Sequence, residues 1–318
     1  RSNQLAQLLH AQGLRRGDHV AIFLENHLVY FEAIWACLRS GLYLTPINRH
    51  LMASEAGYIV DNCDARVLIG SAALEASEEL GHLANRCELK LAVGGAIAGY
   101  SDYRTAVAAQ PPKPLAKEYI GGFMPYTSGT TGRPKGVLFP LPQGNPSEGI
   151  KALEFSMFAI DSSTVYLSPA PLYHSSPMMY ASGVTMAGGA VVMMDKFDAV
   201  LALEYIERYR VTHSQWVPTM FVRMLKLSPE ERTGRDLSSH RCALHAAAPC
   251  PVEVKRQMIE WWGPIIEEFY ASTEGAGAAR ISSAEWLKYP GSVGKPFSAI
   301  HICDESGNEL PPGEPGLI

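Results

Sequence analysis

The sequence predicts an α/β protein with two packed, doubly wound, mostly parallel sheets and a small antiparallel unit at its C-terminal end. Three observations support this fold class. Short apolar runs alternate with helical patterns almost throughout, these units are too many for one mononucleotide-binding sheet, and the pattern changes after residue 292. Hydrophobic residues make up 47% of the 318 residues, which is enough to bury a large core.

The first part of the chain predicts alternating helices and strands. Helices are expected over residues 2–14 and 28–39, and strands over 19–24, 43–47, 66–69 and 89–93, with further helices between these later strands. Leu5, Leu8 and Leu9 share one face of the first helix, and Gly41 ends the second. A Pro-rich connector at 110–117 then leads to a strand ending at Tyr126, a Gly/Thr-rich loop and a strand near 137–139.

The second part continues the alternation. Strands are expected over 191–194, 212–217, 241–245 and 265–270, and helices over 198–210, 218–227 and 251–262. Residues 166–194 contain no Asp, Glu, Lys or Arg, but Pro169, Pro171 and Pro177 exclude a membrane-spanning helix. This segment predicts a strand, a loop, a helix and a strand. Residues 292–318 predict the small antiparallel unit.

Charge and cysteine content narrow the class of protein. Lys and Arg number 27 against 32 Asp and Glu, and this net charge of −5 offers no basic excess for nucleic acid. The six cysteines form no C-x-x-C pair, so they are interpreted as reduced, mostly buried thiols of a cytoplasmic protein. No transmembrane segment is expected. The sequence does not indicate an oligomeric state, and a homodimer is compatible with it.

The most informative segment is YTSGTTGRPKGV, from Tyr126 to Val137. Its glycines let backbone N–H groups converge on an anion, and its hydroxyl side chains add donors. Lys135 adds a mobile positive charge suited to a phosphate oxygen. The spacing is not that of a Walker A loop. The predicted phosphate-binding residues of this loop are Thr127, Ser128, Gly129, Thr130, Thr131, Gly132 and Lys135.

This segment resembles the phosphate-binding signature of the adenylate-forming superfamily, above all its acyl-CoA synthetases. Further matches follow in order: PLYH at 171–174, HAAAPC at 245–250, YASTEG at 270–275, GSVGKP at 291–296 and PPGEPG at 311–316. The resemblance covers residues 1–318 and implies a large N-terminal adenylation domain. It also implies that this domain is trimmed at its start and that a mobile C-terminal domain is absent from the chain.

The resemblance assigns roles to the matching residues. Lys135, Thr273, Glu274 and His174 are implied as the catalytic set. Thr273 would donate to the α-phosphate, and Glu274, with Thr130, would hold Mg²⁺. Tyr270 would flank the adenine, with Ala247, Ala248 and Pro249 on its other face. His174, Met178, Met179 and Ala271 would line the acyl pocket, where Ala271 replaces the family's usual glycine.

The function expected from these features is an ATP-dependent carboxylic acid–CoA ligase. It would use ATP, Mg²⁺ and CoA to activate an apolar, fatty or related acid as an acyl-adenylate. One alternative is an adenylation domain that loads an acid or an amino acid on a carrier protein. Residues 166–194, which are expected to line the pocket, hold no carboxylate for an α-ammonium group. The other alternative is a non-catalytic nucleotide-binding fragment. The sequence does not identify the acid.

Overall fold

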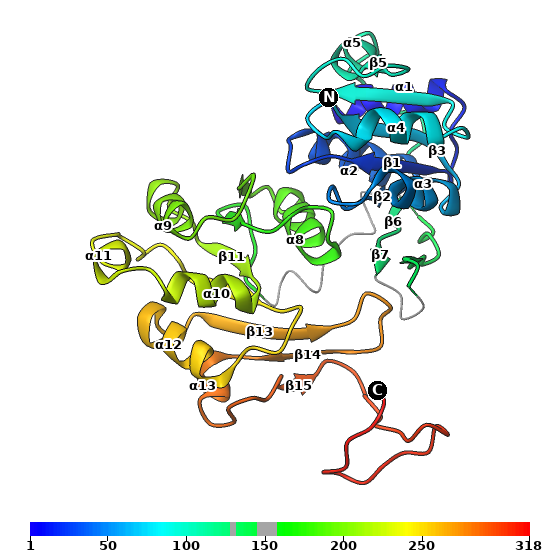
Figure 1. The fold of residues 1–318 in the computed structure, drawn as a ribbon. Helices are drawn as coiled ribbons and strands as arrows, with labels where there is room; N and C mark the ends of the chain where they lie inside the picture. The colour runs from blue at the N-terminus through cyan, green and yellow to red at the C-terminus, as the bar shows by residue number, and fades with distance from the viewer. Residues whose placement is uncertain (128–131, 145–157) are drawn as a thin grey trace. The chain divides into compact units, whose positions relative to one another are not determined.

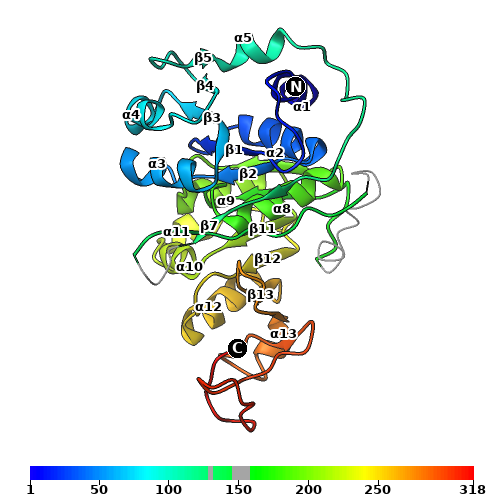
Figure 2. The ribbon, with the colours of Figure 1, turned by 90° about the vertical axis from the view of Figure 1, so that its right-hand side faces the viewer.

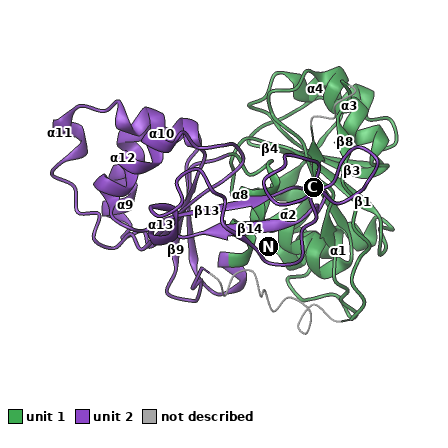
Figure 3. Ribbon diagram, turned by 90° about the horizontal axis from the view of Figure 1, so that it is seen from below, with its two compact units in different colours: residues 1–157, 171–183 green, residues 158–170, 184–318 purple. Residues whose placement is uncertain are grey.

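The computed structural model describes residues 1–127, 132–144 and 158–318 (Figure 1). The chain divides into two compact units, shown in different colours in Figure 3. Unit 1 comprises residues 1–157 and 171–183, and unit 2 comprises residues 158–170 and 184–318. Each unit is built around its own sheet, so the two are described separately.

Unit 1 contains a six-stranded sheet in the order β5-β4-β3-β1-β2-β6, and all its neighbouring strands are parallel. The strands are β1 (His19–Phe23), β2 (Tyr43–Pro46), β3 (Ala65–Ser71), β4 (Leu89–Val93), β5 (Ser101–Asp102) and β6 (Gly122–Phe123). The helices are α1 (Ser2–Ala11), α2 (Val29–Ser40), α3 (Ala53–Asn62), α4 (Ala76–Leu83) and α5 (Tyr103–Ala108). Parallel strands are buried on both faces, and four of the five residues of β1 are buried.

Unit 2 contains a seven-stranded sheet in the order β10-β9-β11-β12-β13-β14-β15. The strands are β9 (Val165–Ser168), β10 (Ala190–Met193), β11 (His213–Trp216), β12 (Cys242–His245), β13 (Ile266–Ala271), β14 (Ala278–Ile281) and β15 (Lys295–Pro296). Pairing is parallel from β10 to β13 and antiparallel from β13 to β15. Together the two sheets confirm the predicted α/β class with an antiparallel C-terminal part.

The helices of unit 2 are α9 (Ala199–Arg208), α10 (Pro218–Leu225), α11 (Pro229–Arg232), α12 (Val252–Trp262) and α13 (Ser283–Trp286). Helix α8 (Ser175–Met186) begins among the residues of unit 1 and ends among those of unit 2. The core of unit 2 contains packed aromatic rings. The centre of the Trp216 ring lies 5.3 Å from that of Trp262 and 6.2 Å from that of Phe221. No helix among the described residues is both long and apolar enough to span a bilayer.

Most predicted elements are found within one or two residues of their expected bounds, but the region around residue 126 differs. The predicted single strand ending at Tyr126 is two short strands, because Pro125 has no N–H to continue a ladder. These are β6 and β7 (Tyr126–Thr127). The prediction of a strand near 137–139 is wrong. The chain pairs instead at β8 (Lys135–Gly136), antiparallel to β7, while Leu138 and Phe139 are exposed.

The Pro-rich connector is held in place by α1. The side-chain amide of Asn3 donates to Pro112 O at 3.1 Å, and that of Gln4 donates to Gln110 O at 2.9 Å. The Gln7 amide donates to the carbonyls of Lys113 and Pro114, each at 3.0 Å. Figure 2 shows α1 beside the chain that follows α5. Side chains thus satisfy the carbonyls of a segment whose prolines cannot form a ladder.

The buried side chain of His240 is expected to make the stability of unit 2 depend on pH. His240 Nε2 lies 2.7 Å from Ser214 Oγ, and burial lowers the pKa of His240 to about 3. Its pKa in the unfolded chain is about 6.5, so between these values only the unfolded state binds the proton. Stability should therefore fall as the pH falls below about 6.5.

We expect His240→Gln to reduce the slope of unfolding free energy against pH, between about pH 4 and 6, by roughly 1.4 kcal/mol per pH unit. Urea unfolding at several pH values measures that slope. His82→Gln is the control, because His82 is exposed in unit 1. An unchanged slope in the His240 variant would show that this imidazole does not stay neutral in the folded protein.

Candidate nucleotide and acid site

The β7–β8 hairpin of unit 1 carries the predicted phosphate-binding loop. Thr127 and Lys135 are register partners at its base, and Lys135 is exposed. Gly132 has a φ of +85°, a conformation that glycine adopts without strain. Ser128, Gly129, Thr130 and Thr131 lie outside the described residues. The described part of the hairpin therefore presents one cation beside a glycine turn.

Helix α3 fixes this hairpin within unit 1. The Tyr126 hydroxyl donates to Asn62 Oδ1 at 2.6 Å, and the Arg133 guanidinium lies 5.4 Å from the centre of the Tyr58 ring. Packing at Gly136 is close, since a Cβ there would meet Met124 Cε at 2.3 Å. The base of the loop is thus anchored by side chains that sequence reasoning did not single out.

The turn predicted to contact the purine follows β12 in unit 2. Ala247, Ala248 and Pro249 are all exposed, whereas His245 and Ala246 beneath them are buried. Ala247 has a φ of +74°, which is uncommon for a residue with a Cβ. Such strained backbone is found preferentially at functional sites. The turn therefore presents small, exposed residues in a backbone conformation that the surrounding fold imposes.

Two of the four predicted catalytic residues, Thr273 and Glu274, follow β13. Tyr270 is half-buried, Ala271 is exposed, and a turn begins at Ser272. Ser272 closes this turn, because its Oγ accepts from Ala276 N at 2.9 Å and its carbonyl accepts from Gly275 N at 3.1 Å. Thr273 is half-buried and Glu274 is exposed on the turn. The fold thereby holds a hydroxyl and a carboxylate just beyond the strand.

Unit 2 brings these two segments together at one edge of its sheet. Strands β12 and β13 are parallel neighbours, with His245 opposite Glu268 in register. Their carboxyl ends therefore lie side by side, and Ala247–Pro249 and Tyr270–Glu274 both leave from that edge. Open α/β sheets bind ligands outside the carboxyl ends of their strands. Two segments of the predicted site thus lie side by side within unit 2.

Glu274 fits a magnesium ion that arrives with a nucleotide. Among the described residues, no three His, Cys, Asp or Glu side chains group as a preformed metal site. Mg²⁺ is typically held by one or two carboxylates together with substrate phosphates. An exposed carboxylate next to the Thr273 hydroxyl is the kind of hard oxygen donor that such an ion takes.

Three of the four predicted acid-side residues lie in unit 1, and Ala271 lies in unit 2. Leu172 N donates to the buried Asn26 Oδ1 at 2.8 Å, which ties the 171–174 segment to the chain after β1. The ring of His174 lies 4.5 Å from that of Tyr173. Partial desolvation lowers the pKa of the exposed His174, so its imidazole is neutral at pH 7.

The two predicted pocket methionines differ in exposure. Met178 is fully buried, whereas Met179 is 42% exposed. The hydroxyl of Ser182 donates to the Met178 carbonyl at 2.7 Å, within α8. Met179 is therefore the one of the pair whose thioether is accessible. The hairpin, His174 and both methionines belong to unit 1, whereas Ala247–Pro249 and Tyr270–Glu274 belong to unit 2.

Sequence reasoning missed a buried ionic cluster beneath the unit 2 segments. Lys255 Nζ, in α12, donates to Glu268 Oε2 at 2.6 Å, and His245 Nε2 lies 3.4 Å from the same oxygen. The signal was present, because Lys255 shares the apolar face of its helix with Met258 and Ile259. A lysine on such a face needs a buried anion to accept its charge.

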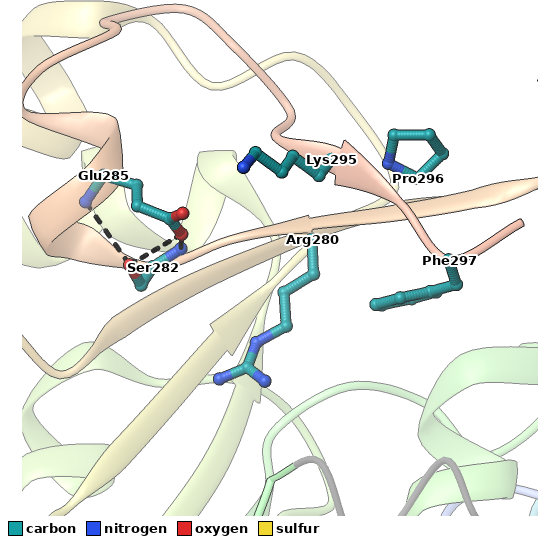
Figure 4. A pocket seen from close by; sticks show the side chains of 6 residues that line it. All are labelled: Arg280, Ser282, Glu285, Lys295, Pro296 and Phe297. Carbon is teal, nitrogen blue, oxygen red and sulfur yellow. Dashed lines mark hydrogen bonds between the residues drawn. The ribbon is translucent and has the colours of Figure 1, made fainter.

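Two surface pockets of unit 2 lie away from the predicted site residues. One, of about 320 Å³, is lined by Arg280, Ser282, Glu285, Lys295, Pro296 and Phe297 (Figure 4). There Ser282 Oγ donates to Glu285 Oε2 at 3.0 Å, and Arg280 Nε donates to Glu267 Oε2 at 3.0 Å. The other, of about 420 Å³, lies beside Trp261. None of the predicted site residues lines either pocket.

Comparison with known proteins matches the whole chain. The model of a family described as AMP-binding enzyme matches residues 1–318. A feruloyl-CoA synthase from an Amycolatopsis species is 32% identical over 99% of this chain and 62% of its own length. ScoC, a fatty acid–[acyl-carrier-protein] ligase from Streptomyces coeruleorubidus, is 26% identical over 100% of this chain and 62% of its own length.

A solved structure supports the fold. The N-terminal domain of FACL13 from Mycobacterium tuberculosis superposes with a TM-score of 0.80 at 20% identity. The match covers 97% of this chain and 77% of that one. At this identity the likeness is one of fold. The chain spans 62% of the length of the feruloyl-CoA synthase it matches.

Proposed function

The chain belongs to the AMP-binding enzyme family, and on this premise we propose that the protein activates a carboxylic acid with ATP and transfers it to CoA. In the first half-reaction a carboxylate oxygen bonds to the α-phosphorus of ATP, and pyrophosphate leaves with the electrons of the broken P–O bond. In the second half-reaction the CoA thiolate attacks the acyl carbon of the acyl-adenylate, and AMP leaves.

One observation carries this proposal. Ala247–Pro249 and Tyr270–Glu274 lie at the carboxyl ends of adjacent parallel strands of the unit 2 sheet, the edge at which open α/β sheets bind ligands. Small exposed residues on one segment and a half-buried aromatic ring on the other suit the two faces of a purine. The Thr273 hydroxyl, next along the same segment, is proposed to donate to the α-phosphate. Fixed donors of this kind stabilise the charge that develops at phosphorus.

Two cationic groups would act on the remaining phosphates. Lys135 is proposed to hold phosphate oxygens, with the loop from Thr127 to Gly132 donating backbone and hydroxyl hydrogens. Glu274, with Thr130 of that loop, is proposed to hold Mg²⁺, which would lower the repulsion between the carboxylate substrate and the triphosphate. Holding two anions in reacting geometry is the protein's main contribution to the rate.

The acid is proposed to be apolar. His174, the exposed Met179 and the buried Met178 would line the acyl side, and Ala271 would add a methyl where the family usually has glycine. Relatives named for feruloyl and fatty acids support an apolar or aromatic acid as substrate. Neutral His174 leaves the substrate carboxylate free of a competing ion pair, so its attack on phosphorus is unhindered.

A carrier protein is a second candidate for the acyl acceptor. ScoC, whose match covers 100% of this chain, is named as a fatty acid–[acyl-carrier-protein] ligase. The experiment that separates the acceptors gives the full-length protein MgATP and a panel of acids. The panel includes long-chain fatty, ferulic and amino acids, offered with either CoA or a phosphopantetheinylated carrier protein. We expect acyl-CoA from apolar acids. Acyl transfer to the carrier alone, or a preference for amino acids, would replace this proposal.

Replacing Glu274 tests the metal assignment. We expect Glu274→Gln to raise the Mg²⁺ concentration needed for half-maximal pyrophosphate release by about 10-fold or more, because a neutral amide is a poorer ligand for a hard cation. Glu305→Gln, an exposed glutamate elsewhere in unit 2, is the matched control. Identical magnesium dependence in Glu274→Gln and the unchanged protein would remove Glu274 from the metal site.

A further inference from the structure

A fully buried lysine lies beneath the proposed nucleotide edge of unit 2. Lys255 has no exposed surface, and its ammonium is 2.6 Å from Glu268 Oε2 and 4.9 Å from the centre of the Trp286 ring. Taking both charges out of water costs several kcal/mol for each ion. A hydrophobic pair of the same volume would often be as stable or more so. Stability alone therefore does not account for this ion pair.

The cluster joins three elements that meet at that edge. Lys255 comes from α12, Glu268 from β13 and His245 from the end of β12. Burial raises the pKa of Glu268, but the nearby His245 side chain and the hydrogen bond and positive charge of Lys255 outweigh this and lower it overall. The Glu268 carboxylate is therefore ionised, and its position is determined by partners on both sides.

Each member is close in sequence to a segment of the proposed site. His245 comes two residues before Ala247, and Glu268 two residues before Tyr270. Glu268 and Tyr270 both belong to β13, and residues two apart in a strand lie on the same face, roughly 7 Å from one another. Helix α12 begins at Val252, directly after the turn, and Lys255 N bonds back to Pro251 O at 3.1 Å. A movement of Lys255 would thus displace both segments.

We propose that Lys255 is a positioning residue that sets the separation between the Ala247–Pro249 turn and Tyr270, and so the affinity for the nucleotide. This inference rests on the proposed function. Directional contacts to Glu268 hold α12 in one register against β13. Apolar side chains would fill the same volume with several near-equal arrangements, because dispersion contacts are not directional.

The test replaces the pair in the full-length protein by Lys255→Met with Glu268→Leu. We expect the unfolding free energy to stay at or above that of the unchanged protein. The KM for ATP and the calorimetric Kd for AMP should rise by about 10-fold or more, while the KM for the acid changes less than about 2-fold. A purely structural role would not produce this split between the two substrates.

The matched control removes an exposed ion pair of the same unit, by Arg210→Met with Asp236→Leu. These side chains are 58% and 53% exposed, so no change in nucleotide binding is expected. If the buried double variant does not fold, Lys255→Gln replaces it, since its amide can still donate to Glu268 without the charge. That variant should raise the KM for ATP by about 3-fold or more.

Two outcomes separate the failure of this inference from that of the proposed function. Wild-type affinity for AMP and ATP in the folded variant would overturn the positioning role and leave the function intact. No ATP or AMP binding by the unchanged protein would overturn the proposed function itself, and the inference with it.

Discussion

Lys255→Met is expected to lower the free energy of unfolding by about 3–5 kcal/mol, because it leaves the Glu268 carboxylate buried without its cation. The remaining neighbour of that carboxylate, His245 Nε2, lies 3.4 Å away, and burial lowers the pKa of His245 so that it carries no charge at pH 7. Denaturant unfolding followed by tryptophan fluorescence measures the loss. Arg210→Met, in an exposed pair, should cost less than about 1 kcal/mol.

The pH dependence of this loss has a definite sign. The folded-state pKa of Glu268 lies below its unfolded value, so its ionic contribution is present above about pH 4.3. That contribution is lost as the pH falls through the lower, folded-state value. The difference between Lys255→Met and the unchanged protein should therefore shrink in acid. If Lys255→Met lowers the unfolding free energy by less than about 1 kcal/mol at pH 7, Lys255 does not balance the buried Glu268 charge as we infer.

Lys135→Ala is expected to weaken the use of ATP by roughly 10- to 100-fold. The variant would lose the proposed charge-assisted hydrogen bond to phosphate, worth about 1.5–3 kcal/mol. Lys135 is exposed and contributes little to the core, so the fold should be unaffected. Steady-state kinetics of pyrophosphate release, with ATP and acid varied separately, should place the defect on ATP.

The control is Lys113→Ala, an exposed lysine of the connector in the same unit. Its kinetics should match those of the unchanged protein within about 2-fold. If Lys135→Ala shows normal ATP kinetics, or a defect confined to the acid, the hairpin does not bind phosphate.

The sequence predicted most strands of both sheets, though not β5 or β14, because buried parallel strands are short, apolar and bounded by helices. Strand β4 was predicted at its observed bounds, and β1 within one residue. Prediction failed where pairing depends on a single backbone group. Pro125 divides what reads as one strand, and Lys135–Gly136 pairs with Tyr126–Thr127 although its composition is that of a loop.

The candidate site could be predicted as far as its exposed residues follow local motifs. The described residues of the motifs at 126–137, 245–250 and 270–275 each fall at a strand end or in a turn, where small, hydroxyl or glycine residues have a local effect. The supporting contacts were not predictable, because they join residues far apart in the chain. Asn26 meets Leu172, and Tyr126 meets Asn62. Asn26 and Asn62 belong to no motif, and only the topology brings them to Leu172 and Tyr126.

The most direct test of the central claim is acid-dependent ATP–pyrophosphate exchange by the full-length protein. Labelled pyrophosphate enters ATP only if an acyl-adenylate forms reversibly. We predict exchange that requires Mg²⁺ and an apolar carboxylic acid, and that Lys135→Ala reduces. Calorimetric binding of ATP without exchange, for every acid of the panel, would contradict the claim. The protein would then be a nucleotide-binding protein that does not adenylate.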